Sequence, residues 1–183
     1  MLLSQVLVTV ALATTSVLAA LPPVGVPVVL VNQETGMFFD DKDRIAPIGN
    51  PIIGFPFNNG GNQKWILASD NISGGSADYT FLGVLPAANI SSSGALGAGL
   101  NVQPTPSIYT ITELGNDNIT PFYRCDLTKS QHCNSHSPHP RIAQGEFVVT
   151  APDDRSGQLT FQTLNTTSRF QHWRIFATSA ISG

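Results

Sequence analysis

Short runs of apolar residues, several of them alternating with polar residues, recur between clusters of glycine, asparagine, proline and aspartate. Alternation with a period of two is typical of half-buried strands, and almost no segment has the 3.6-residue period of an amphipathic helix. The pattern predicts an all-β domain of many short strands, either a sandwich or a barrel. Residues 87–99 lack a strand pattern and are expected to form a loop. The predicted strands are residues 27–31, 37–39, 52–57, 65–68, 79–85, 108–114, 146–150, 158–164 and 173–177.

The first residues do not belong to this pattern. Residues 6–18 are largely apolar and uncharged, and small residues follow at Val17-Leu18-Ala19. Such a run is too short to span a bilayer, and it is typical of a secretory signal peptide, here residues 1–19. The remaining length suits a single domain, residues 24–183, and it contains no other apolar run of spanning length. We therefore expect a secreted protein without membrane insertion.

Two further features of the sequence can be interpreted if the protein is secreted. Four sequons for N-glycosylation begin at Asn71, Asn89, Asn118 and Asn165, and four in a secreted chain indicate a glycoprotein with these asparagines on surface loops. The chain has two cysteines, Cys125 and Cys133. In an oxidising compartment we expect them to form a disulfide that closes a short hairpin.

The charge of the chain argues against two classes of partner. Charged residues make up 11% of the sequence, the net charge is −3, and lysine and arginine together number nine. Binding to nucleic acid requires clustered positive charge for phosphate contacts, and the same argument applies to anionic membranes. We expect neither partner.

Internal repeats distinguish among the all-β architectures. Trp65 follows Gln63 by two residues, Trp173 follows Gln171 by two, and the two tryptophans are 108 positions apart. Between them, Tyr109 begins another alternating run and is the candidate for a middle copy. The longer last interval contains the cysteines and a segment rich in serine, histidine and proline, which suggests an insertion near residues 121–141. Three repeats with buried aromatics at 65, 109 and 173 are predicted.

The two Gln-x-Trp motifs resemble the signature of the ricin-B-like lectins. That resemblance implies a β-trefoil, in which twelve short strands form three pseudo-repeats, six strands making a barrel and six a cap. It also implies that Trp65 and Trp173 are core residues and that each glutamine ties down a turn. The likeness is sharpest over residues 30–68 and 158–177.

The same resemblance suggests a sugar site in the first repeat. Family sites combine an aspartate, an aromatic residue about fifteen positions later, and an Asn-Gln pair before the tryptophan. Asp40, Phe55, Asn62 and Gln63 match that order. A hexose offers hydroxyls to polar side chains and a C–H face to an aromatic ring. Alternatively, Phe55 packs in the core, the acidic stretch 40–43 is a solvated turn, and Trp65 is only a core plug.

The other two repeats match less well. The middle repeat has no tryptophan, no signature glutamine and no aspartate in phase. The last repeat has Phe161 near the aromatic spacing and Glu146 fifteen residues earlier, but Phe170 replaces the asparagine. At most one sugar site, in the first repeat, is therefore expected.

Other functions remain open. His132, Cys133, His136 and His139 lie close in sequence, but a disulfide would remove the thiolate, so no metal site is predicted. No nucleophile elbow, phosphate-binding glycine loop or cofactor motif is present, and we expect neither an enzyme nor a cofactor. Besides binding carbohydrate or glycoprotein glycans, the protein could inhibit a protease through residues 124–141 or 87–99. It could also be a cell-wall or interaction protein without a site.

Overall fold

The computed structural model describes residues 21–45, 47–73, 76–85, 87–113, 119–124, 147–154 and 156–180. Within these residues the chain forms twelve strands and four 3-10 turns of three residues each. None of the helical segments described is long or apolar enough to cross a membrane.

The strands fall into three consecutive units of four. The first unit consists of β1 (Pro27–Asn32), β2 (Phe38–Asp41), β3 (Ile52–Phe55) and β4 (Trp65–Ser73). The second consists of β5 (Ser76–Gly83), β6 (Asn89–Ser91), β7 (Asn101–Gln103) and β8 (Ile108–Glu113). The third consists of β9 (Ile119–Arg124), β10 (Phe147–Thr150), β11 (Thr160–Thr163) and β12 (Trp173–Ala177).

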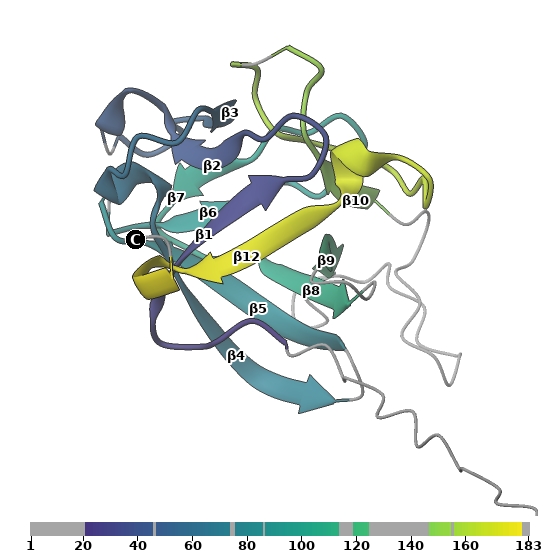
Figure 1. The fold of residues 1–183 in the computed structure, drawn as a ribbon, viewed down its shortest axis with the longest axis horizontal. Helices are drawn as coiled ribbons and strands as arrows, with labels where there is room; N and C mark the ends of the chain where they lie inside the picture. The colour runs from purple at the N-terminus through teal and green to yellow at the C-terminus, as the bar shows by residue number, and fades with distance from the viewer. Residues whose placement is uncertain are drawn as a thin grey trace, which may run out of the picture.

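The first and last strands of the three units close a barrel. Antiparallel pairing runs from β1 to β4, β5, β8, β9 and β12, and β12 pairs again with β1. The second and third strands of each unit pair as hairpins, β2–β3, β6–β7 and β10–β11. In Figure 1 these hairpin strands gather at the upper end of the molecule, above the long strands β4 and β5.

The three hairpins meet around a pseudo-threefold axis. The Ile52 N–H donates to Leu100 O at 2.9 Å, Leu100 N–H to Leu159 O at 3.0 Å, and Leu159 N–H to Ile52 O at 2.9 Å. All three side chains are fully buried. This cyclic set of bonds makes residues 52, 100 and 159 equivalent, and it fixes which residues of the three units correspond.

Aromatic side chains fill the barrel beneath this axis. Trp65, Tyr109 and Trp173 are all buried. Phe39 meets the Trp173 ring edge-on at a centroid distance of 4.5 Å, and Tyr109 stacks on Phe161 at 6.4 Å. Each buried aromatic side chain removes about 150–250 Å² from water, worth roughly 4–6 kcal/mol as an upper estimate. These rings account for much of the burial in this small barrel.

The structure corrects two predictions about segments. Residues 87–99 were expected to form a loop, but they contain β6. Three residues with one apolar side chain, Ile90, are too short to show a period of two, although Ile90 is fully buried. The predicted insertion at 121–141 begins too early, because residues 121–124 belong to β9. Its remaining residues lie outside the described part of the chain. The short strand β7 was also not predicted.

Candidate functional site

Asp40 lies near the end of β2 with its carboxyl group held by two side-chain amides. Its exposed fraction is 2%. Gln63 Nε2 donates to Asp40 Oδ2 at 2.8 Å, and Asn58 Nδ2 donates to the same oxygen at 3.1 Å. Oδ1 takes part in neither bond. The expectation of a solvated turn at 40–43 is therefore wrong for Asp40 and also for Asp41, which is fully buried.

Gln63 is the residue that fixes this arrangement. It is fully buried in the 3-10 turn η2 (Gly61–Gln63), just before β4. Its Oε1 accepts the Asn58 backbone N–H at 2.8 Å, and its Nε2 donates to Pro56 O at 2.8 Å as well as to Asp40. Because both ends of the side chain are engaged, Gln63 orients Asp40 and braces the turn from Pro56 to Asn58.

Gln171 braces the equivalent turn of the third repeat and lies in the 3-10 turn η3 (Arg169–Gln171). Its Oε1 accepts the Asn165 N–H at 2.7 Å, and its Nε2 donates to Thr163 O at 2.9 Å and to Thr150 Oγ1 at 3.2 Å. Thr150 thus stands where Asp40 stands in the first repeat. In both repeats the glutamine braces the turn before the last strand. Its side-chain partner is an aspartate in the first repeat and a threonine in the third.

Two exposed phenylalanines lie at the end of β3 and just after it, in the hairpin that carries Asp40. Phe55 is 40% exposed and Phe57 is 41% exposed. In the β2–β3 ladder Phe38 faces Phe55 and Asp40 faces Ile53, so Phe55 and Asp40 project from the same side of the hairpin. Phe57 packs on Phe38 at a centroid distance of 4.9 Å. Sequence reasoning identified Phe55 and missed Phe57, although the Phe-Pro-Phe spacing was visible.

The side chain of Asn62 is buried, unlike that of a residue exposed to a ligand. It is 2% exposed, and its Nδ2 lies 3.4 Å from Asp41 O. Its Oδ1 is buried and accepts no hydrogen bond from the described residues. A Cβ atom on Gly60 would overlap this oxygen, so a side chain at position 60 would force Asn62 to shift.

Burial sets the electrostatics of both neighbouring aspartates. It raises the pKa of Asp40 above the ordinary 3.8, and nearby side-chain amides and the charge of Arg44 offset part of the rise. Burial also raises the pKa of Asp41 to about 6, an effect reduced by a hydrogen bond from Asn50. That bond, from Asn50 Nδ2 to Asp41 Oδ1, is 2.6 Å long. Asp41 Oδ2 has no partner among the described residues.

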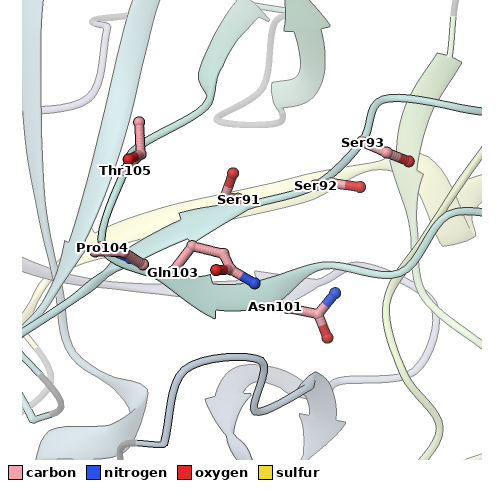
Figure 2. Close-up of a pocket in the computed structure, with 7 residues that line it drawn as sticks. All are labelled: Ser91, Ser92, Ser93, Asn101, Gln103, Pro104 and Thr105. Atoms are coloured by element: carbon pink, nitrogen blue, oxygen red, sulfur yellow. The ribbon is translucent and has the colours of Figure 1, made fainter.

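The equivalent hairpin of the second repeat forms a polar hollow of about 300 Å³. Residues 52 and 100 are equivalent at the threefold axis. Counting along the paired strands from them, Ser91 corresponds to Asp40 and Gln103 corresponds to Phe55. Ser91 and Ser107 share a hydrogen bond of 2.8 Å between their hydroxyls. The hollow thus has neither an acid nor an aromatic ring. Its lining, shown in Figure 2, is Ser91, Ser92, Ser93, Asn101, Gln103, Pro104 and Thr105.

The third repeat also differs from the first. Thr150 and Gln162 occupy the positions of Asp40 and Phe55. Phe161, which the sequence placed near the aromatic spacing, is fully buried and belongs to the core. Glu146 lies outside the described residues. Among the described residues of the three hairpins, the combination of an aspartate and an exposed aromatic occurs in the first.

Several sequence predictions fall on other parts of the chain. Asn165 is exposed on a turn, where its Oδ1 accepts the Thr167 hydroxyl at 2.8 Å. Asn89 and Asn71 lie in strands β6 and β4 rather than on the expected surface loops. Asn118, Cys125, Cys133 and the histidine cluster at 132–139 lie outside the described residues. Within the described ranges, no group of three His, Cys, Asp or Glu side chains could hold a metal ion.

Comparison with known proteins identifies the architecture. No family model and no curated protein sequence matches the chain. The ricin B-like lectin of Macrolepiota procera, in complex with lactose, matches with a TM-score of 0.60 and 16% identity over 85% of this chain and 98% of its own. The Rhizoctonia solani agglutinin matches with a TM-score of 0.61 and 16% identity, covering 86% and 99%. The chain is a β-trefoil.

A third neighbour supports the assignment of the β-trefoil fold. The designed threefold-symmetric protein ThreeFoil matches this β-trefoil with a TM-score of 0.60 and 14% identity, over 81% of this chain and 96% of its own. That neighbour is threefold symmetric by design, and residues 52, 100 and 159 mark a pseudo-threefold axis in this chain. At identities this low, the likeness establishes the fold, and function has to be argued from the site.

Proposed function

We propose that this β-trefoil is a non-catalytic carbohydrate-binding protein of the ricin-B-like kind, with its sugar site in the first repeat. The observation that carries the proposal is the buried carboxyl group of Asp40, held by Gln63 and Asn58 beside the exposed ring of Phe55. An oriented carboxylate next to an apolar ring suits a hexose, which has hydroxyls on its edge and C–H groups on its face.

Each predicted site residue has a role in this proposal. Asp40 accepts a hydrogen bond from a sugar hydroxyl through Oδ1, the oxygen that Gln63 and Asn58 do not bond, and Phe55 packs against the sugar ring. Gln63 holds Asp40 in place without touching the ligand, since both ends of its side chain bond to protein. Asn62, which the sequence predicted as a hydroxyl contact, is buried and instead ties the turn to β2 through its Nδ2 and Asp41 O.

The wider context of the proposal comes from the sequence. The apolar leader at 1–19 and the sequons support a secreted protein whose partners are carbohydrates or the glycans of glycoproteins. One structural neighbour, the Macrolepiota procera lectin, is in complex with lactose. No contact among the described residues favours the alternative of a protease inhibitor. Residues 87–99, one of its two candidate loops, are partly pinned by the fully buried Ile90.

A glycan array with matched variants tests the proposal. Asp40→Asn keeps the shape of the side chain but replaces an acceptor with a donor, and it should weaken binding about thirtyfold, corresponding to roughly 2 kcal/mol. Phe55→Ala should weaken it about tenfold through loss of ring contact. Gln162→Ala, at the equivalent position of the third repeat, is the control and should bind like wild type.

Thermal unfolding of each variant separates loss of binding from loss of folding. If Asp40→Asn and Phe55→Ala both retain wild-type affinity, the site assignment is wrong. If the wild-type protein binds no glycan at all, the carbohydrate-binding proposal is wrong.

A further inference from the structure

The turn after β2 holds two adjacent residues in an unfavourable backbone conformation. In the 3-10 turn η1 (Lys42–Arg44), Asp43 has φ 61° and Arg44 has φ 56°. Residues with a Cβ atom rarely adopt positive φ, and two in succession persist only where the surrounding structure enforces them. Such strain is common where a side chain has to be presented in one direction for function.

A buried amide enforces the conformation of this turn. Asn50 Nδ2 lies 2.6 Å from Asp41 Oδ1, 2.7 Å from Lys42 O and 3.1 Å from Ile45 O. Asn50 is 9% exposed, so these bonds are shielded from water. The amide therefore ties both ends of the turn to β2, while Arg44 itself remains exposed to solvent.

The guanidinium of Arg44 lies at the edge of the proposed sugar site. A Cβ atom on Gly60 would lie 2.7 Å from Asn58 Oδ1 and 3.5 Å from Arg44 Nε. Asn58 is also the residue whose Nδ2 donates to Asp40 Oδ2. Arg44 and Asp40 thus flank the same turn, and the positive charge of Arg44 acts on the Asp40 carboxyl group.

Arg44 has donors available for a ligand. Among the residues that the structure describes, its side chain takes part in no hydrogen bond or ion pair. A guanidinium presents a planar fork of N–H donors that binds carboxylate or sulfate in a bidentate manner. An exposed arginine held by a strained, clamped turn beside a sugar site is arranged to recognise an anion on the ligand.

We propose that the first-repeat site binds an acidic saccharide, whose carboxylate is bound by Arg44 while Asp40 and Phe55 hold the sugar ring. This inference rests on the proposed function, which it deepens by naming the class of ligand. Asp43, exposed in the same turn, carries the opposite charge and opposes the binding of an anion. Arg44 therefore favours the binding of acidic sugars, and Asp43 disfavours it.

Titration calorimetry with three matched oligosaccharides tests the inference. They carry terminal galactose, terminal galacturonic acid or terminal 6-sulfated galactose on the same core. Wild type should prefer an acidic form over the neutral form about tenfold, which corresponds to about 1.4 kcal/mol. The better acidic form identifies the anion, and stronger binding of the sulfated form would overturn the assignment to carboxylate.

Four variants test whether this turn causes the preference for acidic over neutral sugars. Arg44→Gln should abolish the ratio of acidic to neutral affinity, and Arg44→Lys should restore part of it. Asp43→Asn should raise affinity for the acidic sugar severalfold, and asparagine tolerates positive φ. Arg169→Gln, an exposed arginine in the third repeat, changes net charge equally and should leave the ratio at the wild-type value. Raising NaCl from 50 to 500 mM should weaken acidic binding more than neutral binding.

The outcomes separate this inference from the proposed function. If Arg44→Gln keeps the wild-type ratio of acidic to neutral affinity, Arg44 does not bind the anion and the inference is wrong. Wild-type binding to the neutral sugar with no preference for either acid overturns the inference and leaves the proposed lectin function standing. Absence of binding to all three sugars overturns both.

Discussion

At the scale of single residues, two adjacent aspartates have different surroundings because they project from opposite faces of β2. Asp40 accepts hydrogen bonds from Gln63 and Asn58. Asp41 accepts one from Asn50 and keeps an unpartnered, buried Oδ2 among the described residues. Asp40 is therefore held in place within the proposed sugar site, whereas Asp41 ties the strained turn to the strand.

The raised pKa of Asp41 predicts a pH-dependent stability. Its folded-state value of about 6 exceeds the ordinary 3.8, so the folded protein holds this proton more tightly than the unfolded chain does. The stabilising contribution of protonated Asp41 is complete below about pH 4 and is lost as the pH rises to about 6. Asp41→Asn should remove that loss and raise the free energy of unfolding at pH 7 by about 1 kcal/mol.

Urea unfolding between pH 4 and pH 7 measures this effect. Asp153→Asn, an exposed aspartate elsewhere, is the control and should keep the wild-type slope. Parallel slopes for wild type and Asp41→Asn would show that Asp41 titrates normally.

At the scale of elements, the glutamine of each Gln-x-Trp motif braces a turn before a barrel strand. Gln63 and Gln171 make matching bonds to the backbone of the preceding loop. The sequence therefore indicated the brace through the repeated motif. It did not reveal that Thr150 takes the place of Asp40, because the intervals between the elements differ in the two repeats.

Paired substitutions separate the brace from the site. Gln63→Ala and Gln171→Ala should each lower the free energy of unfolding by about 1–2 kcal/mol, since each removes a buried amide that makes partly buried hydrogen bonds to the turn. Only Gln63→Ala should also abolish glycan binding, because it releases Asp40. Urea unfolding and calorimetry on both variants measure the two effects. Glycan binding retained by Gln63→Ala would show that Asp40 does not need this support.

At the scale of the whole molecule, the pseudo-threefold axis holds the three units together. Residues 52, 100 and 159 come from β3, from the segment before β7 and from the segment before β11, and their backbones bond in a ring. The same axis brings the three hairpins into one cap over the aromatic core. The site in the first unit is therefore built on a support to which all three units contribute.

Leu100 is the test of that support. Leu100→Ala should lower the free energy of unfolding by about 2–5 kcal/mol, because it leaves a cavity at the axis where the side chain is fully buried. Leu96→Ala, at a position 57% exposed, should change stability by no more than about 0.5 kcal/mol. Equal stabilities in denaturant unfolding would contradict a shared core at the axis.

The parts of the fold predicted from sequence are those with local signals. The alternating runs predicted β12 with its observed bounds and β4 and β5 in part, and the repeated Gln-x-Trp motif indicated a trefoil. The short strand β6 was missed because a single buried residue, Ile90, carries no periodicity. Its place in the sheet depends on pairing with β5 and β7 rather than on its own composition.

For the candidate site, the sequence alone determined the residue types and their order: Asp40, Phe55 and the Asn62-Gln63 pair. Tertiary structure decided which of them face solvent, since Phe55 is exposed while Asp40, Asn62 and Gln63 are buried. It also brought Arg44 beside Asn58, and in the other two hairpins the described residues equivalent to Asp40 and Phe55 are neither acidic nor aromatic. Local spacing records which side chains are near in the chain, but burial and hydrogen bonding depend on contacts between segments far apart in it.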